Sequence, residues 1–359
     1  RMRSPYFIVL LLSVTFLGCK TETFEETNVS LDNYKIVDGF KLEVLAAEPL
    51  LEAPITMDFD DKGRMWVVEM RGYMPNLEGI GEDEPNGRIS IMEDLDKDGI
   101  ADHAKVFLDN LILPRAIAHV YGGLLYVEPP NLWFVEIDND LPGKKTLVDS
   151  LYADAGNVEH QPNGLMMNID NWIYNANSNF RYKLKDGKWL KEPTSYRGQW
   201  GISKDDFGRL YYNGNSTQIK SDFVLPNTTV QNKYFSPKAS LNKVLTPTER
   251  IYPIHATSIN RGYVEGMLDQ DSVVLKVTSA CGPLIYRGGQ FSNEYNQNAF
   301  TCAPEANLIK RNILSFEDYK TSAKAAWDNK EFLASTDEGF RPVNLFNGPD
   351  GGMYIVDMH

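Results

Sequence analysis

A short pattern, in which a polar turn leads into an apolar strand, recurs along this chain. Each copy places Asp, Asn or Gly in a turn and follows it with aromatic or β-branched residues, as in Trp66-Val67-Val68 and Tyr354-Ile355-Val356. Turn residues of this kind between short strand-forming runs are typical of β-hairpins. The copies span residues 57–70, 118–130, 166–178, 201–215, 297–307 and 346–358. The pattern therefore predicts a succession of antiparallel strands.

The recurrence also predicts how the strands assemble. A supersecondary unit that recurs along a chain buries its apolar faces against its neighbours. Six copies predict an all-β chain that folds as a six-bladed β-propeller over residues 34–359. A β-sandwich is the alternative for an all-β chain, but a single sandwich seldom needs this length or this repetition.

The spacing of the copies adds three expectations. The long interval between the fourth and fifth copies predicts an insertion over residues 226–272. Residues 315–330 are the one stretch with the amphipathic spacing of a helix. The last copy runs to Met358 and His359, so the last blade is expected to be incomplete and the chain to be truncated there.

The N-terminus predicts export and lipidation. Arg1 and Arg3 precede an apolar run at residues 6–16, which is too short to span a bilayer and reads as a signal peptide over residues 1–19. The run ends in Leu-Gly-Cys, and this resembles the lipobox of bacterial lipoproteins, with Cys19 as the lipidated residue. An ordinary signal peptide with an incidental cysteine is the alternative. Residues 20–33 are acidic and poor in apolar side chains, which predicts a flexible tether.

Charge and the remaining cysteines narrow the setting. A net charge of −13 argues against nucleic acid as a partner, because phosphates require a basic surface. The lipobox places the chain in a bacterial cell envelope, most simply at the outer membrane. In that oxidising compartment Cys281 and Cys302 are expected to form a disulfide, against the alternative of two free buried thiols.

An acidic loop predicts a cation site. Asp94, Asp96 and Asp98 alternate ahead of Gly99, and Asp102 follows. Carboxylates at this spacing, with the carbonyl of Ile100, supply the oxygen ligands that Ca²⁺ prefers, as in the first half of an EF-hand loop. Lys105 stands where an EF-hand has its bidentate Glu, so the expectation is a Ca²⁺ loop between strands. A solvated acidic turn without metal is the alternative.

Among the five histidines, His160 has the surroundings of a functional residue. It lies just before the third copy of the repeat, among Asn157, Glu159, Gln161 and Asn163. Hydrogen-bonding side chains in a loop that leads into a strand are typical of a ligand-facing loop, and a histidine there can act as a general base near neutral pH.

The order of segments resembles that of a known group of proteins. The segments are LEAPITMDFDDKGRMWVVE, EHQPNGL, YRGQWGISKDDFGRLYYNGN, ACGPLIYRGGQF and EGFRPVNLFNGPDGGMYIVD. Together they are similar to the soluble quinoprotein glucose and sorbosone dehydrogenases. They are more closely similar to membrane-bound dehydrogenase domains that are often joined to a CxxCH cytochrome c module.

The resemblance implies a cofactor and residue roles. It implies pyrroloquinoline quinone (PQQ) as cofactor, a sugar or other alcohol as substrate, and a cytochrome c domain or protein as electron acceptor. His160 would be the base that takes the substrate's hydroxyl proton, and Arg197 would stabilise the negative charge that develops on the quinone. Arg341, Gln161 and Asn215 would be further cofactor contacts. For the two arginines, a blade-to-blade ion pair is the alternative.

Two other functions stay open from the sequence. A lactonase-type hydrolase would need a central cation, held by side chains such as Glu69, Glu128, Asn163, Asn175 and Asn215. A non-catalytic propeller that binds a glycan or a protein would need neither the base nor a pair of arginines at one site.

Overall fold

The computed structural model describes residues 29–235 and 237–358. The predicted signal peptide, the lipidation at Cys19 and most of the predicted tether lie outside this range. Strands account for most of its regular structure, and its helices are the short 3₁₀ turns η1 (Val158–His160), η2 (Asn293–Tyr295) and η3 (Pro304–Ala306). No helix in the described part has the length and apolar character needed to cross a membrane.

The described strands form six antiparallel sheets. The first sheet comprises β2 (Pro54–Phe59), β3 (Met65–Glu69), β4 (Gly87–Glu93) and β5 (His103–Leu111). The second comprises β6 (Ala116–Val120), β7 (Gly123–Glu128), β8 (Asn131–Asp138) and β9 (Leu141–Asp149). The third comprises β10 (Asn163–Met167), β11 (Ile173–Ala176), β12 (Ser178–Lys185) and β13 (Lys188–Arg197).

The remaining sheets differ in size. The fourth comprises β14 (Ser203–Lys204), β15 (Leu210–Gly214), β16 (Thr217–Ser221) and β17 (Lys243–Val244). The fifth comprises β1 (Tyr34–Ile36), β18 (Cys281–Ile285), β19 (Ala299–Ala303), β20 (Leu308–Glu317), β21 (Lys320–Ala325) and β22 (Leu333–Ser335). The last has only β23 (Pro342–Asn347) and β24 (Met353–Asp357).

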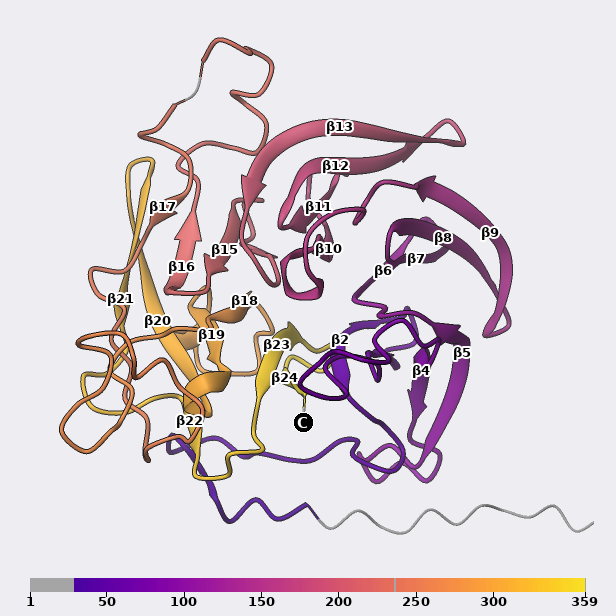
Figure 1. The fold of residues 1–359 in the computed structure, drawn as a ribbon. Helices are drawn as coiled ribbons and strands as arrows, with labels where there is room; N and C mark the ends of the chain where they lie inside the picture. The colour runs from indigo at the N-terminus through magenta and orange to yellow at the C-terminus, as the bar shows by residue number, and fades with distance from the viewer. Residues whose placement is uncertain (1–28, 236, 359) are drawn as a thin grey trace, which may run out of the picture.

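Alternation along each strand explains why the sheets stack. In β3, Trp66 and Val68 pack with residues of the second sheet, such as Tyr126. Val67, which lies between them, packs on the opposite side with Val356 of the last sheet. Successive side chains of a strand point to opposite faces, so each sheet buries both faces against its neighbours. Figure 1 shows the sheets arranged around a common centre, which is consistent with a β-propeller.

The inner strands are the ones that surround this centre: β2, β6, β10, β14, β18 and β23. Their beginnings meet closely. A Cβ atom added to Gly164 would lie 3.1 Å from the Cα of Gly201, and one added to Gly201 would lie 3.0 Å from the Cα of Gly282. Asn344 closes the ring, because its Nδ2 donates a hydrogen bond of 2.8 Å to the carbonyl of Ile55. The inner strands thus begin at one end of the ring, here called the entry end, and finish at the exit end.

Two sequence-based expectations about local structure are wrong. Residues 315–330 form no helix: β20 and β21 make a hairpin whose turn has Asp318 at φ 53°. Residues 315–317 of β20 are exposed, and β21 alternates between exposed and buried positions, so the apolar spacing there belongs to a strand and not to a helix. The expected disulfide is absent as well, since Cys281 and Cys302 are free thiols at directly paired positions of β18 and β19. Burial raises the pKa of the Cys302 thiol, and this opposes the thiolate that oxidation requires.

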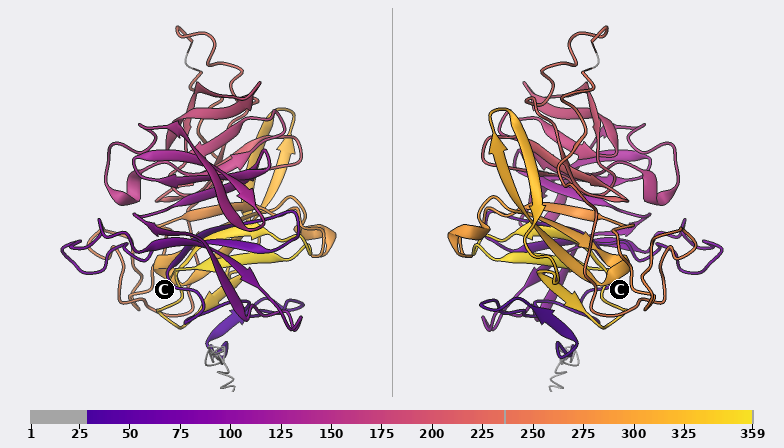
Figure 2. Two further views of the ribbon diagram at one scale, coloured as in Figure 1. Left: turned by 90° about the vertical axis from the view of Figure 1, so that its right-hand side faces the viewer. Right: turned by 90° about the vertical axis from the view of Figure 1, so that its left-hand side faces the viewer.

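The predicted insertion is largely irregular. Between residues 222 and 280 the described chain has β17 and two isolated bridges, Arg250 with Lys276 and Leu268 with Val274. Its apolar residues pack outward of the ring centre, on residues of the fifth sheet such as Leu308 and Ala334. The side views in Figure 2 show part of this segment projecting at the edge of the ring.

Candidate functional site

His160 lies at the entry end, on the short turn η1 directly before β10. Its imidazole is exposed, and its Nδ1 lies 3.4 Å from Nε2 of Gln199, which precedes β14. The neighbouring Glu159 accepts a hydrogen bond of 2.7 Å from the hydroxyl of Tyr73, which lies in the loop between β3 and β4. Loops of the first, third and fourth sheets therefore meet around His160.

Asn163 holds this arrangement in place. Its side chain is 1% exposed, and its Nδ2 donates to the carbonyl of Gln199 at 2.7 Å. Its Oδ1 accepts a bond of 2.8 Å from the backbone N–H of Gly201. The amide thus ties the start of β10 to the segment before β14 and keeps Gln199 beside His160.

Arg197 forms a buried ion pair between two sheets. It ends β13, is 1% exposed, and its Nε donates to Oδ2 of Asp222 at 2.7 Å. Its Nη1 donates to Thr194 and to the carbonyl of Ser195. Asp222 follows β16, so the contact joins the third and fourth sheets, which is the alternative that the sequence left open.

The other expected cofactor contacts are spread around the entry end. Arg341, which is half-buried, donates from Nη1 to the carbonyl of Pro304 at 2.7 Å. Gln161 donates to the carbonyl of Ala153, and the carbonyl of Asn215 accepts from the backbone of Ala280. Of the five residues, His160 and Gln161 are adjacent, whereas Arg197, Arg341 and Asn215 make contacts elsewhere.

Sequence reasoning missed a buried cation next to the His160 turn. Arg115 is 1% exposed, and its Nη1 donates to the carbonyl of Val158 at 2.7 Å. Its Nε and Nη2 have no hydrogen-bond partner among the described residues, and burial lowers its pKa to about 10. A sequence signal existed: an arginine stands between Pro114 and the apolar start of β6. Nε1 of Trp200 and the side-chain amide of Asn213, also at the entry end, are likewise buried, and neither has a hydrogen-bond partner within residues 29–235 and 237–358.

The side chains expected to hold a central cation in a hydrolase do not form a common site. Glu69 accepts bonds from Arg88 and Ser90 within the first sheet. Asn175 accepts from Tyr152 and donates to the carbonyl of Phe180. Glu69 is thus bound within the first sheet, and Asn175 contacts Tyr152, which follows β9 of the second sheet. Both side chains are engaged by other groups, so they give the hydrolase hypothesis no site.

The acidic loop brings three carboxylates together. Ligand oxygens of Asp94, Asp96 and Asp102 lie within 4.8 Å of one another, and all three side chains are exposed. Backbone N–H groups of Lys97 and Gly99 donate to Asp94, and that of Ile100 donates to Asp98. A backbone hydrogen bond lowers the pKa of Asp96, but desolvation and the neighbouring carboxylates outweigh it and raise the pKa overall.

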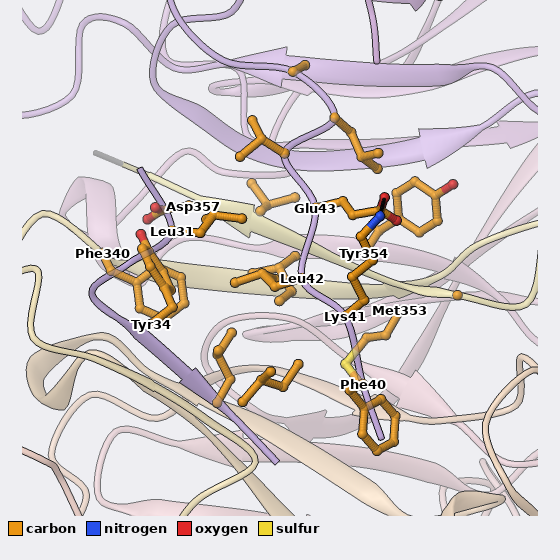
Figure 3. A pocket seen from close by; sticks show the side chains of 18 of the residues that line it. Leu31, Tyr34, Phe40, Lys41, Leu42, Glu43, Phe340, Met353, Tyr354 and Asp357 are labelled. Atoms are coloured by element: carbon orange, nitrogen blue, oxygen red, sulfur yellow. Dashed lines mark hydrogen bonds and ion pairs between the residues drawn. The ribbon is translucent and has the colours of Figure 1, made fainter. Parts of the chain in front are cut away.

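Two cavities accompany these features. The larger, about 1020 Å³, lies between the N-terminal segment and the last sheet, where Phe40 and Leu42 face Met353 and Tyr354 (Figure 3). The smaller, about 310 Å³, lies at the ring centre and is lined by residues of all six inner strands. None of the predicted site residues lines either one.

The ring of sheets around a central cavity defines a protein of the β-propeller type. A family model described as a domain of unknown function, DUF7133, matches residues 26–359, so the chain belongs to that family. A search of curated proteins finds no match.

Solved structures show the same fold. An oxidoreductase (glucose dehydrogenase) of Thermus thermophilus aligns over 86% of this chain and 91% of its own, at 11% identity and a TM-score of 0.50. The PQQ domain of pyranose dehydrogenase from Coprinopsis cinerea, in its holo form, aligns over 90% and 94%, also at 11% identity and 0.50. The expected likeness to quinoprotein sugar dehydrogenase propellers is confirmed at the level of the fold.

The entry end has a donor set that suits PQQ. This cofactor presents carboxylates and quinone carbonyls, which are hydrogen-bond acceptors, and needs cationic or N–H partners. Arg115 and Trp200 have buried N–H groups that no described residue accepts. A buried polar group without a partner costs free energy, and a bound acceptor would remove that cost.

Proposed function

We propose that this chain is a quinone-dependent dehydrogenase that oxidises a sugar or another alcohol at the entry end. The observation that carries the proposal is the exposed imidazole of His160 on a turn whose Val158 carbonyl binds the buried Arg115, a cation whose Nε and Nη2 have no partner among the described residues. The fold supports it, because structures of the same fold include a PQQ domain of a sugar dehydrogenase. Each sheet would be one blade of a six-bladed propeller.

His160 would act as the general base. A glutamine side chain can present either its amide oxygen or its amide nitrogen to a neighbour. If Gln199 presents Oε1 to Nδ1 of His160, the imidazole carries its proton on Nδ1. The lone pair on Nε2 is then free for the substrate hydroxyl. Gln199 is then a positioning residue. Arg115, whose Nη1 binds the carbonyl of Val158, would hold an anionic group of the quinone. When bound, the quinone would supply the hydride acceptor. Arg197 would keep the third and fourth sheets in register through Asp222.

The test is reconstitution with PQQ and Ca²⁺, followed by quinone absorbance and dye reduction with a panel of sugars and alcohols. Wild type should bind the quinone and turn over. His160→Ala should bind it and lose about 10²-fold to 10⁴-fold in kcat, whereas His103→Ala, which removes an exposed histidine of β5, should change neither. A wild-type protein that binds no quinone at any Ca²⁺ concentration would rule the proposal out.

Gln199→Glu gives a sharper readout of the positioning role. A carboxylate beside His160 raises the pKa of the imidazole, so the base stays protonated to higher pH. The acidic limb of the kcat profile should therefore move to higher pH, whereas Glu317→Gln, which removes an exposed carboxylate of β20, should leave it near its wild-type position. An unmoved limb in Gln199→Glu would show that Gln199 does not contact the base.

We also propose that the loop of Asp94, Asp96, Asp98, Ile100 and Asp102 binds Ca²⁺. The clustered carboxylates and the raised pKa of Asp96 support it, since a cation would relieve their mutual repulsion. Calcium should raise Tm in wild type but not in Asp96→Asn with Asp102→Asn, while Asp109→Asn, in the neighbouring β5, should respond as wild type does. Equal Tm shifts in all three would contradict a site here.

Anchoring through Cys19 in the bacterial cell envelope, with a cytochrome c as electron acceptor, completes the proposal. Labelled palmitate should be incorporated by wild type and not by Cys19→Ser. Incorporation into Cys19→Ser, or none into wild type, would remove the anchor.

A further inference from the structure

The cavity at the ring centre has charged groups at the end opposite to His160. Asp58 and His119 stand near the ends of β2 and β6, Lys204 ends β14, and Arg287 follows β18. All four residues line the cavity. Because the inner strands run in the same direction, these side chains gather at the exit end.

One wall of the cavity carries two cationic side chains, Lys204 and Arg287. Lys204 is half-buried, and its Nζ donates to the carbonyl of Met167 at 2.5 Å. No carboxylate of the described residues forms an ion pair with it. Arg287 pairs with Asp206 through a 2.6 Å bond from Nε. Burial lowers the pKa of Lys204 and the charge of Arg287 lowers it further, whereas the carboxylate of Asp170 opposes this shift. The carboxylate of Asp206 binds Arg287, and those of Asp170 and Asp58 lie near Lys204 and on the facing wall, but none of the three forms an ion pair with Lys204. An ammonium has three N–H donors, so Lys204 has donors left for an anionic ligand beyond its bond to Met167.

The facing wall offers a hydrogen-bond acceptor. Oδ2 of Asp58 accepts from the backbone N–H of His119 at 2.7 Å and lies 3.2 Å from its Nδ1. When Nδ1 donates this bond, the neutral imidazole leaves Nε2 as an acceptor. Nε2 is buried and has no partner among the described residues. Trp66 packs its ring edge-to-face on the imidazole at 4.8 Å and fixes its orientation.

The volume limits the size of a ligand. The cavity measures about 310 Å³, which is room for roughly ten water molecules at about 30 Å³ each. That is the lower end of the range for small-molecule sites. A ligand of a few carbon atoms fits, with an anionic end for Lys204 and Arg287 and a hydroxyl end for His119.

We propose that the exit-end cavity binds a small hydroxycarboxylate, with its carboxylate between Lys204 and Arg287 and its hydroxyl donating to Nε2 of His119. This site is separate from the one proposed around His160, and its ligand does not depend on the chain being a dehydrogenase.

The test is calorimetry of the full chain with lactate, propionate and glycerol as probes. Lactate has both ends, propionate lacks the hydroxyl, and glycerol lacks the carboxylate. Wild type should bind lactate at least about tenfold more tightly than propionate, and should not bind glycerol measurably. No lactate binding by wild type, or equal affinity for all three probes, would overturn the proposal.

Substitutions test which side chains bind the carboxylate end of the ligand and which bind its hydroxyl end. Lys204→Met and Arg287→Gln should each weaken lactate binding by about tenfold or more, and His119→Gln should remove the preference for lactate over propionate. Lys188→Met, which removes an exposed lysine at the start of β13, is the matched control and should bind as wild type does.

A loss of lactate binding can be distinguished from a folding defect and from failure of the dehydrogenase proposal. If Lys204→Met loses its circular dichroism spectrum, Arg287→Gln decides, because Arg287 lies at the exposed rim. Wild-type affinity in that folded variant would refute the assignment of the anionic end. His160→Ala should keep full lactate affinity, so failure of the dehydrogenase proposal leaves this test intact.

Discussion

Asn163 of the third sheet accepts a hydrogen bond of 2.8 Å from the backbone N–H of Gly201, which lies two residues before the fourth sheet's inner strand. The same amide donates to the carbonyls of Gln161 and Gln199. One buried side chain therefore satisfies three backbone groups of two neighbouring sheets, and its removal would leave those groups short of a partner.

Asn163→Ala should accordingly destabilise the protein by about 2–4 kcal/mol, because buried backbone groups lose their partners. Urea unfolding measures the change. Asn157→Ala is the control, because Asn157 is exposed and its side chain makes no capping bond to η1. Equal stability of the two variants would mean that water replaces the lost bonds.

Gly201→Ala tests the close approach of the inner strands. Gly201 has φ +81°, and an added Cβ would lie 3.0 Å from Gly282 and Pro283. Gly266 has φ +71° with nothing within 4 Å, so Gly266→Ala carries the backbone cost alone, about 1 kcal/mol. Gly201→Ala should cost at least about 1 kcal/mol more, from the steric clash. Equal losses in thermal unfolding would place the inner strands farther apart than described.

Arg197→Met isolates the buried ion pair with Asp222. Removing one partner of a buried pair leaves an uncompensated charge and should cost about 3–5 kcal/mol. Lys41→Met breaks the exposed pair of Lys41 with Glu43 and should cost less than about 1 kcal/mol. Chemical denaturation compares the two. A small loss for Arg197→Met would favour a role for this arginine outside the ion pair.

Glu305→Gln should change how stability depends on pH. Glu305 is buried, with Oε1 accepting from the backbone of Thr278 and Oε2 without a hydrogen-bond partner among the described residues. Desolvation raises the pKa of this carboxyl in the folded state. Between the unfolded pKa of about 4.5 and the higher pKa of the folded state, the native state therefore binds more protons than the unfolded state. The free energy of unfolding falls as the pH rises through this interval.

The neutral glutamine has no such loss. Glu305→Gln should be more stable than wild type at pH 8, by on the order of 1 kcal/mol, and the gain should shrink as the pH falls toward 4.5. Tm measured from pH 4 to pH 8 checks this. The exposed Glu317→Gln should track wild type throughout, and a gain for Glu305→Gln that does not vary with pH would contradict the assignment.

Much of the fold could be predicted from local patterns in the sequence. Trp66-Val67-Val68 lies in β3 and Tyr354-Ile355-Val356 in β24, as predicted, because strand propensity and turn chemistry act over a few residues. The prediction of a helix over residues 315–330 is wrong because a period of 3.6 and the alternation of a short strand such as β21 give similar spacing over so few residues.

The candidate site was predicted less completely. The loop that carries His160 can be recognised from the sequence, because its polar side chains cluster directly before a strand. The partner of Arg197 is not, since Asp222 lies 25 positions away in another sheet and only the tertiary packing brings them together. The burial of Arg115 could not be predicted from the sequence either, because it depends on a contact with Val158, 43 positions away.

The bond between Asn344 and Ile55 spans 289 positions. Each sheet of the ring forms mainly from strands close together in sequence, whereas this closure must bring the two ends of the fold together, and the entropy lost in closing a loop grows with its length. Contacts of such separation slow folding. Individual sheets are therefore expected to form first and the ring to close last, which makes the contact between the first and last sheets the step that limits refolding.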